Sequence, residues 1–202
     1  MNKKKSKNAK AKPELSGDEN FLSLEALMPG FGRLFDDKKT LSDRELNAFL
    51  ESQMASGEIF GGDLDPLDEA QSLIYEAWNT SGPRKLELAR EALDISPDCA
   101  DAYILLAEAE QKNRGTALNL YLRAVEAGKK AVDPAHFPQS PEYFWEAMET
   151  RPFMRAKLGL AQCLWELHRR EEAIGHLREL IRLNPADPQK AGDILAKYLA
   201  KS

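Results

Sequence analysis

Apolar residues recur at helical spacing between residues 154 and 187, which is the clearest pattern in the chain. Because residues three and four apart share one face of a helix, this pattern predicts two amphipathic helices. The polar residues 168–170 separate the helices, and Asn184-Pro185 ends the second one. The apolar positions are Leu158, Leu160, Ala161, Leu164, Trp165 and Leu167, followed by Ala173, Ile174, Leu177, Leu180, Ile181 and Leu183.

The same order of helix, turn and helix occurs twice upstream, in residues 66–99 and 100–131. In the first copy Pro83 follows the polar turn, where its missing N–H is not needed because a helix is starting. The second copy turns at residues 111–115. Residues 188–202 place apolar side chains on one helical face and lysines on the other, which is typical of the closing helix of a repeat array.

The segment 132–153 interrupts the repeats. Pro134, Pro138 and Pro141 exclude a long helix there. The segment also contains the aromatic cluster Tyr143-Phe144-Trp145. Two interpretations stay open, a plug that fills the gap between the second and third copies or a partner site. We favour the plug, because neighbouring repeats need a continuous contact.

The N-terminal part of the chain differs from the rest. Residues 1–20 have almost no large apolar side chains, which predicts disorder. Residues 21–62 form an arm with one firm helix, which begins at the capping box Ser42-Asp43-Arg44-Glu45. Its apolar face consists of Leu46, Phe49, Leu50 and Met54. This face docks either on the first repeat, which we favour, or in a groove of this protein or of a partner. The helical domain then spans residues 63–202.

The net charge of -5 hides an asymmetry along the 202 residues. Residues 1–12 hold six lysines and no acid, residues 13–150 have a net charge of -15, and residues 151–202 have a net charge of +4. The acidic middle disfavours broad contact with nucleic acid phosphates. The lysine-rich tail is either a solvated tail, which we favour, or a nucleic acid contact. The second interpretation gives an alternative function, a nucleic-acid-associated adaptor.

Cysteine usage and hydropathy predict a cytoplasmic protein. Cys99 and Cys163 belong to no CxxC pattern, and Cys163 falls on an apolar helix face, as expected for a core residue. The lysine-rich start is not followed by the apolar segment of a signal peptide. No apolar run approaches the roughly 18–20 residues that a membrane span needs, so we expect no membrane contact.

No catalytic motif is recognisable in the sequence. It has no GxGxxG, GxxxxGK[ST], HExxH or GxSxG pattern. The histidines His136, His168 and His176 share no metal-ligand spacing. We therefore expect no metal, no cofactor and no enzymatic activity.

Registered on their prolines, the three copies resemble the tetratricopeptide repeat (TPR), a helix–turn–helix unit of about 34 residues. The third copy matches with Ala161, Ala173, Leu177 and Pro185, while Leu180 is larger than usual. More specific phrases are DPLDEAQ at 65–71, ISPDCADAY at 95–103, and ETRPFMRA at 149–156 followed by GLAQ at 159–162. Together they resemble bacterial relatives of the suppressor-of-tumorigenicity-7 family over roughly residues 65–187.

The resemblance implies an all-α, TPR-type right-handed superhelix of about three helix pairs, with a C-terminal capping helix and a partly disordered N-terminal arm. It also implies a non-catalytic scaffold that binds a peptide or partner helix in its concave groove. The first helix of each pair lines such a groove. The candidate partner-binding residues are Ile74, Trp78, Asp101, Ile104, Glu108, Arg155, Leu158, Gln162 and Trp165, with Ala70 and Ala77 beside them. Alternatively, Trp78 and Trp165 pack between copies, and Arg155 pairs with a nearby carboxylate.

Overall fold

The computed structural model describes residues 65–110, 112–132, 144–145, 147–186 and 189–201. Within these residues it contains seven α-helices, one 3-10 helix and no strand, which confirms the predicted all-α class. The helices are α3 (Pro66–Trp78), α4 (Pro83–Ile95), α5 (Ala100–Ala109), α6 (Arg114–Ala131), η4 (Met148–Thr150), α7 (Arg151–Glu166), α8 (Arg170–Leu183) and α9 (Ala191–Leu199). The predicted tail and N-terminal arm lie outside the described residues.

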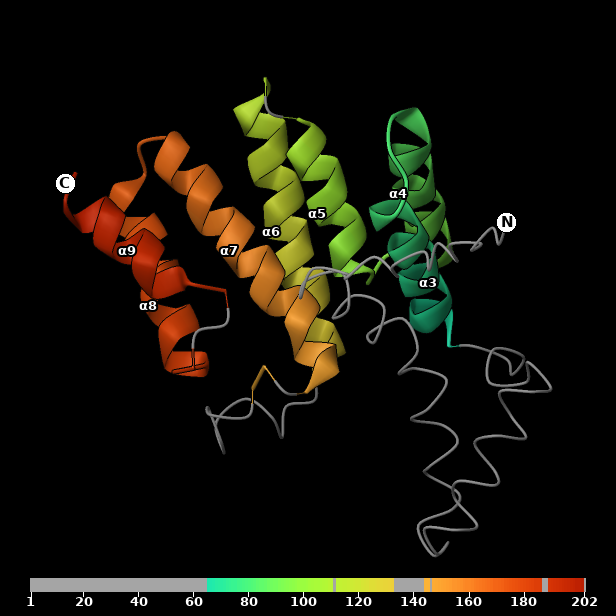
Figure 1. Cartoon of the computed structure of the whole chain (residues 1–202). Helices are drawn as coiled ribbons and strands as arrows, with labels where there is room; N and C mark the ends of the chain where they lie inside the picture. The colour runs from blue at the N-terminus through green and yellow to red at the C-terminus, as the bar shows by residue number, and fades with distance from the viewer. Residues whose placement is uncertain (1–64, 111, 133–143, 146, 187–188, 202) are drawn as a thin grey trace, which may run out of the picture.

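The helices stack side by side in chain order, from α3 and α4 at one end to α8 and α9 at the other (Figure 1). Each helix packs against the next, and α5 also contacts both α3 and α7. The first helices of the three predicted pairs therefore lie next to one another. We call this set of helices the α3–α5–α7 layer.

Local sequence signals explain where the helices begin. The Asp65 carboxylate accepts a hydrogen bond from the Leu67 N–H (2.8 Å), and the Asn113 side chain accepts one from Thr116 (3.3 Å). α6 and α7 begin earlier than the periodicity predicts: residues 114–115 of the predicted turn and residues 151–153 of the predicted insertion are helical. A proline in the first turn, such as the one after Arg151, costs no hydrogen bond, so α7 accommodates it.

Small and medium apolar residues fill the spaces between the helices. Ala70, Ala77 and Ala92 are fully buried between α3 and α4, where their size allows close packing. Cys163 is 3% exposed, which confirms that it is a core residue. These helix faces are the ones on which the sequence places its apolar stripes.

Residues before α7 fold back onto the core. Phe144 is 2% exposed, and its ring lies edge-on to that of Phe153 with centroids 6.3 Å apart. The Trp145 carbonyl accepts a hydrogen bond from Arg151 Nε at 2.9 Å, and the guanidinium of Arg151 covers the Trp145 ring. Phe144 and Trp145 thus occupy core space, as the plug interpretation predicts. Tyr143 lies outside the described residues.

Two glycines allow α6 and α7 to approach each other closely. A Cβ atom on Gly128 would lie 2.7 Å from the Cα atom of Phe153, which is too close for any real side chain. On Gly159 it would collide with the ring of Tyr121. By contrast, a Cβ atom on Gly175 of α8 would meet nothing within 4 Å.

We predict that Gly128→Ala lowers the free energy of unfolding by about 1–3 kcal/mol, because the methyl group overpacks against backbone atoms that cannot move aside. Gly175→Ala is the matched control. It removes a flexible residue from an exposed helical position and should stabilise the protein by up to about 1 kcal/mol. Urea denaturation of both variants measures the difference. Equal stability changes in the two variants would show that α6 and α7 do not pack this closely.

The α7–α8 contact contains buried polar groups. Lys157 is buried, and its ammonium lies 2.6 Å from the Glu179 carboxylate. Nδ1 of His176 is buried and has no hydrogen-bond partner among the described residues. Burial lowers the pKa of His176 below its ordinary 6.5, and the charge of Lys157 acts in the same direction.

This pKa shift predicts a loss of stability in mild acid. Above the ordinary pKa, His176 is neutral in both states and contributes nothing. As the pH falls below about 6.5, the unfolded chain takes up the proton more readily than the folded one, which favours unfolding. Urea denaturation between about pH 7.5 and pH 5.5 should therefore show that the free energy of unfolding falls more steeply for the wild type than for His176→Gln. Parallel pH profiles would contradict the expectation.

Candidate functional site

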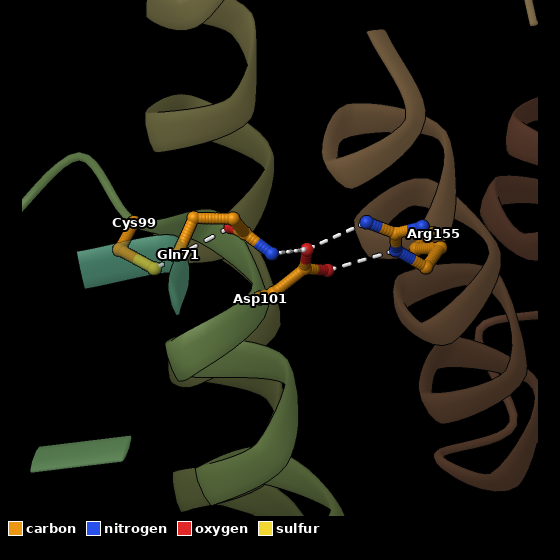
Figure 2. A network of polar contacts seen from close by, with 4 residues as sticks. All are labelled: Gln71, Cys99, Asp101 and Arg155. Carbon is orange, nitrogen blue, oxygen red and sulfur yellow. Dashed lines mark hydrogen bonds and ion pairs between the residues drawn. The ribbon is translucent and has the colours of Figure 1, made fainter. Parts of the chain in front are cut away.

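A buried carboxylate lies at the centre of the α3–α5–α7 layer. Asp101, on α5, is 1% exposed. Arg155, on α7, holds it with two hydrogen bonds, from Nε to Oδ1 at 2.9 Å and from Nη2 to Oδ2 at 2.6 Å (Figure 2). A bidentate pair of this kind fixes the relative position of the two helices, and the guanidinium balances the charge of the carboxylate.

The first helix of the layer joins the same network. Nε2 of Gln71, on α3, donates to Asp101 Oδ2 at 2.9 Å, and the Cys99 thiol donates to Gln71 Oε1 at 3.8 Å (Figure 2). Burial raises the pKa of the Cys99 thiol to about 12, with a smaller contribution from the charge of Asp101. The thiol therefore keeps its proton at neutral pH and can donate it to this hydrogen bond. We call Gln71, Cys99, Asp101 and Arg155 the polar network.

An aromatic ring also contacts the arginine of the polar network. The guanidinium carbon of Arg155 lies 5.2 Å from the ring centroid of Trp78, a cation–π contact. Arg155 thus has both the Asp101 carboxylate and the Trp78 ring as partners. The alternative that Arg155 pairs with a nearby carboxylate is therefore confirmed.

A first cavity, of about 480 Å³, opens beside the polar network. We call it the apolar cavity, because most of its lining surface is apolar. It lies between α3, the N-terminal ends of α5 and α7, and the C-terminal end of α6. Its lining includes Leu67, Tyr75, Ala131, Met148 and Arg155. The acidic residues Asp68, Asp98 and Glu149 also line it.

A second cavity, of about 280 Å³, lies between the C-terminal halves of α5 and α7 and the start of α6. We call it the polar cavity. Its lining includes Glu108, Arg114, Tyr121, Gln162, Cys163 and Glu166. Arg114 forms an ion pair with Glu166, whereas Glu108 has no ion-pair partner among the described residues.

Three ionisable groups that line the polar cavity have raised pKa values. Partial burial raises the pKa of Glu108, with Lys85 opposing the shift and Asp101 adding to it. Burial also raises the pKa of Tyr121 to about 12, and the charges of Glu108 and Glu166 contribute. The pKa of Cys163 is raised by burial and by Glu166. Each group is shifted toward its neutral form, chiefly because burial disfavours the charged form.

The nine predicted site residues do not form one site in the structure. Ile74 is fully buried in the α3–α4 core, and Asp101 is buried within the polar network, so neither can touch a partner. This corrects the prediction for both residues, because their helix faces pack against neighbouring helices. Trp165 stacks on Tyr198 of α9 with centroids 3.8 Å apart and planes 7° from parallel. It lines a hollow near the C-terminus and neither of the two cavities.

The remaining predicted residues lie on or near the layer. Glu108 and Gln162 are exposed and come together in the polar cavity. Arg155 lines the apolar cavity and contacts Trp78, which is partly buried. The two aliphatic residues of the set, Ile104 and Leu158, are partly buried against core clusters.

Sequence reasoning missed Gln71 and Tyr121. Gln71 belongs to the phrase DPLDEAQ, and an amide on the otherwise apolar face of Ala70 and Ile74 is a signal that could have identified it. Tyr121 gives no such signal, because it reaches the polar cavity only where Gly159 leaves room for its ring.

The described residues contain neither a metal-ligand cluster nor a membrane-spanning helix. No group of three or more His, Cys, Asp and Glu side chains lies close enough there to hold a metal ion. In the same part of the chain, no helix is both long and apolar enough to span a bilayer.

A protein-family profile matches most of this chain. The profile of the family described as "ST7 protein" matches residues 38–187. The chain belongs to the ST7 protein family. The match includes every residue of the polar network and both cavities. It begins well before residue 65, where the sequence resemblance starts, and so takes in the amphipathic helix predicted after Ser42.

Similar proteins carry the same family name. "Suppressor of tumorigenicity 7 protein-like" is 31% identical over 132 residues in Homo sapiens and 29% identical over 130 residues in Gallus gallus. Each alignment covers 62% of this chain and 23% of the relative. "Suppressor of tumorigenicity 7 protein" of Mus musculus is 29% identical over 152 residues, or 62% of this chain and 26% of that protein. This chain thus aligns with about a quarter of the length of these relatives.

The polar network predicts a large effect of removing its carboxylate. Asp101→Ala leaves Arg155 and Gln71 without their acceptor inside the layer, so we expect it to lower the free energy of unfolding by about 3 kcal/mol. Combining it with Arg155→Ala should cost less than the sum of the two single changes, because the pair is then removed together. Chemical denaturation of the three variants tests both statements.

The control for this prediction is an ion pair on the surface. Arg169 and Glu172 form such a pair at 2.6 Å, and both side chains are exposed. Glu172→Ala should change stability little, since exposed pairs are screened by solvent. If Asp101→Ala has no greater effect than Glu172→Ala, the polar network does not hold the layer together.

Proposed function

We propose that this ST7 family member is a non-catalytic scaffold that binds a peptide segment of a partner protein on the α3–α5–α7 layer. We further propose that its helix pairs form a TPR-type right-handed superhelix. The observation that carries the proposal is that residues of both α5 and α7, the first helices of two successive pairs, line each of the two cavities. Cavities that combine apolar surface with a few polar groups suit side-chain anchors of a ligand.

The chemistry of the layer supports binding over catalysis. The Asp101 carboxylate is buried and accepts three hydrogen bonds from Gln71 and Arg155, so a substrate has no access to it. The thiols of Cys99 and Cys163 both have raised pKa values, which lowers their thiolate fraction. These potentially reactive groups are thus held in unreactive states.

Two further proposals come from the sequence. We propose a cytoplasmic location, because two buried free cysteines fit a reducing compartment. The alternative function, a nucleic-acid-associated adaptor, rests on the six lysines of residues 1–12. We prefer a protein partner, because the net charge of -15 over residues 13–150 repels phosphates.

Site-specific photocrosslinking tests the proposed binding face. A photoreactive amino acid replaces Gln162, which is exposed in the polar cavity, in the full-length chain expressed in its native host. The control replaces Arg178, which is exposed on α8 and lines neither cavity. We expect a protein adduct from position 162 that position 178 does not give. The same adducts from both positions would contradict binding on this layer.

A further inference from the structure

We propose that the bound peptide is extended and inserts an apolar side chain into the apolar cavity and a lysine or arginine side chain into the polar cavity, three residues away. This inference rests on the proposed function, because it assumes that a peptide binds on the α3–α5–α7 layer. It adds the chemical identity and the spacing of the two anchors.

The spacing follows from the helices that the two cavities share. Ala100 and Arg155 line the apolar cavity, and Ala107 and Gln162 line the polar one. The two residues of each pair are seven positions apart, on α5 and on α7. Seven residues are almost two full turns, so the two residues of each pair lie on the same side of their helix, about 10 Å apart along its axis.

The apolar cavity favours an uncharged anchor. Leu67, Tyr75, Ala131 and Met148 offer aliphatic and aromatic surface, which an apolar side chain covers with a gain in free energy. The cationic residue that lines it, Arg155, already has its charge balanced by Asp101. An acidic anchor would therefore find no free cation here among the described residues.

The polar cavity favours a cationic anchor. Glu108 lines it without an ion-pair partner in the described part of the chain, while Arg114 is already engaged by Glu166. The charge of Glu108 helps to raise the pKa of Tyr121, and that of Glu166 helps to raise the pKa values of Tyr121 and Cys163, although burial is the larger cause. A lysine or arginine side chain would pair with Glu108.

The direct contact of α5 with α7 favours an extended ligand. A helix with its side chains is about 10–12 Å wide, so an extended chain fits along two touching helices more readily. An extended chain advances about 3.3 Å per residue, so three residues cover the distance of about 10 Å between the cavities. The predicted motif is therefore an apolar residue and a basic residue at positions i and i+3, in either order.

Selection from a random peptide library by the full-length protein tests this motif. We expect the enriched peptides to carry a large apolar residue and a lysine or arginine three positions apart. Glu108→Gln should abolish enrichment of the basic residue and keep that of the apolar one. Ala131→Phe, which fills the apolar cavity, should abolish enrichment of the apolar residue and keep that of the basic one. Ala131→Met fills the cavity less and should weaken the apolar preference less. Thermal unfolding of each variant confirms that it is folded.

The matched control is Glu126→Gln, which changes an exposed glutamate of α6 that lines neither cavity. It should retain both preferences. For the best peptide, replacing its basic residue with norleucine should weaken binding to the wild type by about tenfold and leave binding to Glu108→Gln nearly unchanged.

The possible outcomes separate the two proposals. Enriched peptides without a basic position, or a basic preference that survives in Glu108→Gln, would overturn the inference and leave the proposed binding function intact. If no peptide is enriched over a blank surface, the proposed function fails, and the inference fails with it.

Discussion

The helical layer depends on how the protein buries the carboxylate of Asp101. A buried charge without partners costs several kcal/mol, so α3 and α7 must bring Gln71 and Arg155 to it. Few relative positions of the three helices satisfy this requirement, because a guanidinium that donates two parallel hydrogen bonds has little freedom. The contribution of such a pair lies more in specifying one arrangement than in adding stability. Both cavities are built on the arrangement that results.

Much of the helical order is predictable from the sequence, because each helix buries an apolar stripe whose period shows in the residues themselves. Prolines and caps add the starting points, as at Pro66 and Asn113. The polar network is not predictable in this way. Gln71 and Asp101 are 30 residues apart, and nothing near either one indicates its partner. The network becomes visible only when the packing of whole helices is known.

The candidate site residues are likewise predictable only in part. Spacing places Ile74 in the groove, but its helix face packs against α4, so the side chain is fully buried. Trp165 fits the pattern well, yet Tyr198 covers it. The path into α9 runs through Lys190 in a left-handed conformation (φ 56), a backbone state that a lysine does not signal. Glu108 and Gln162, by contrast, are exposed and both line the polar cavity.

The polar network has a consequence for how the protein unfolds. In a linear array each repeat contacts only its neighbours, so the ends can open while the middle stays folded. Here Gln71 comes from the first helix pair, Asp101 from the second and Arg155 from the third, and all three share one hydrogen-bonded group. Opening either end exposes polar groups that the rest of the array needs. These three pairs are therefore linked into a single cooperative unit, a property of compact domains more than of modular chains.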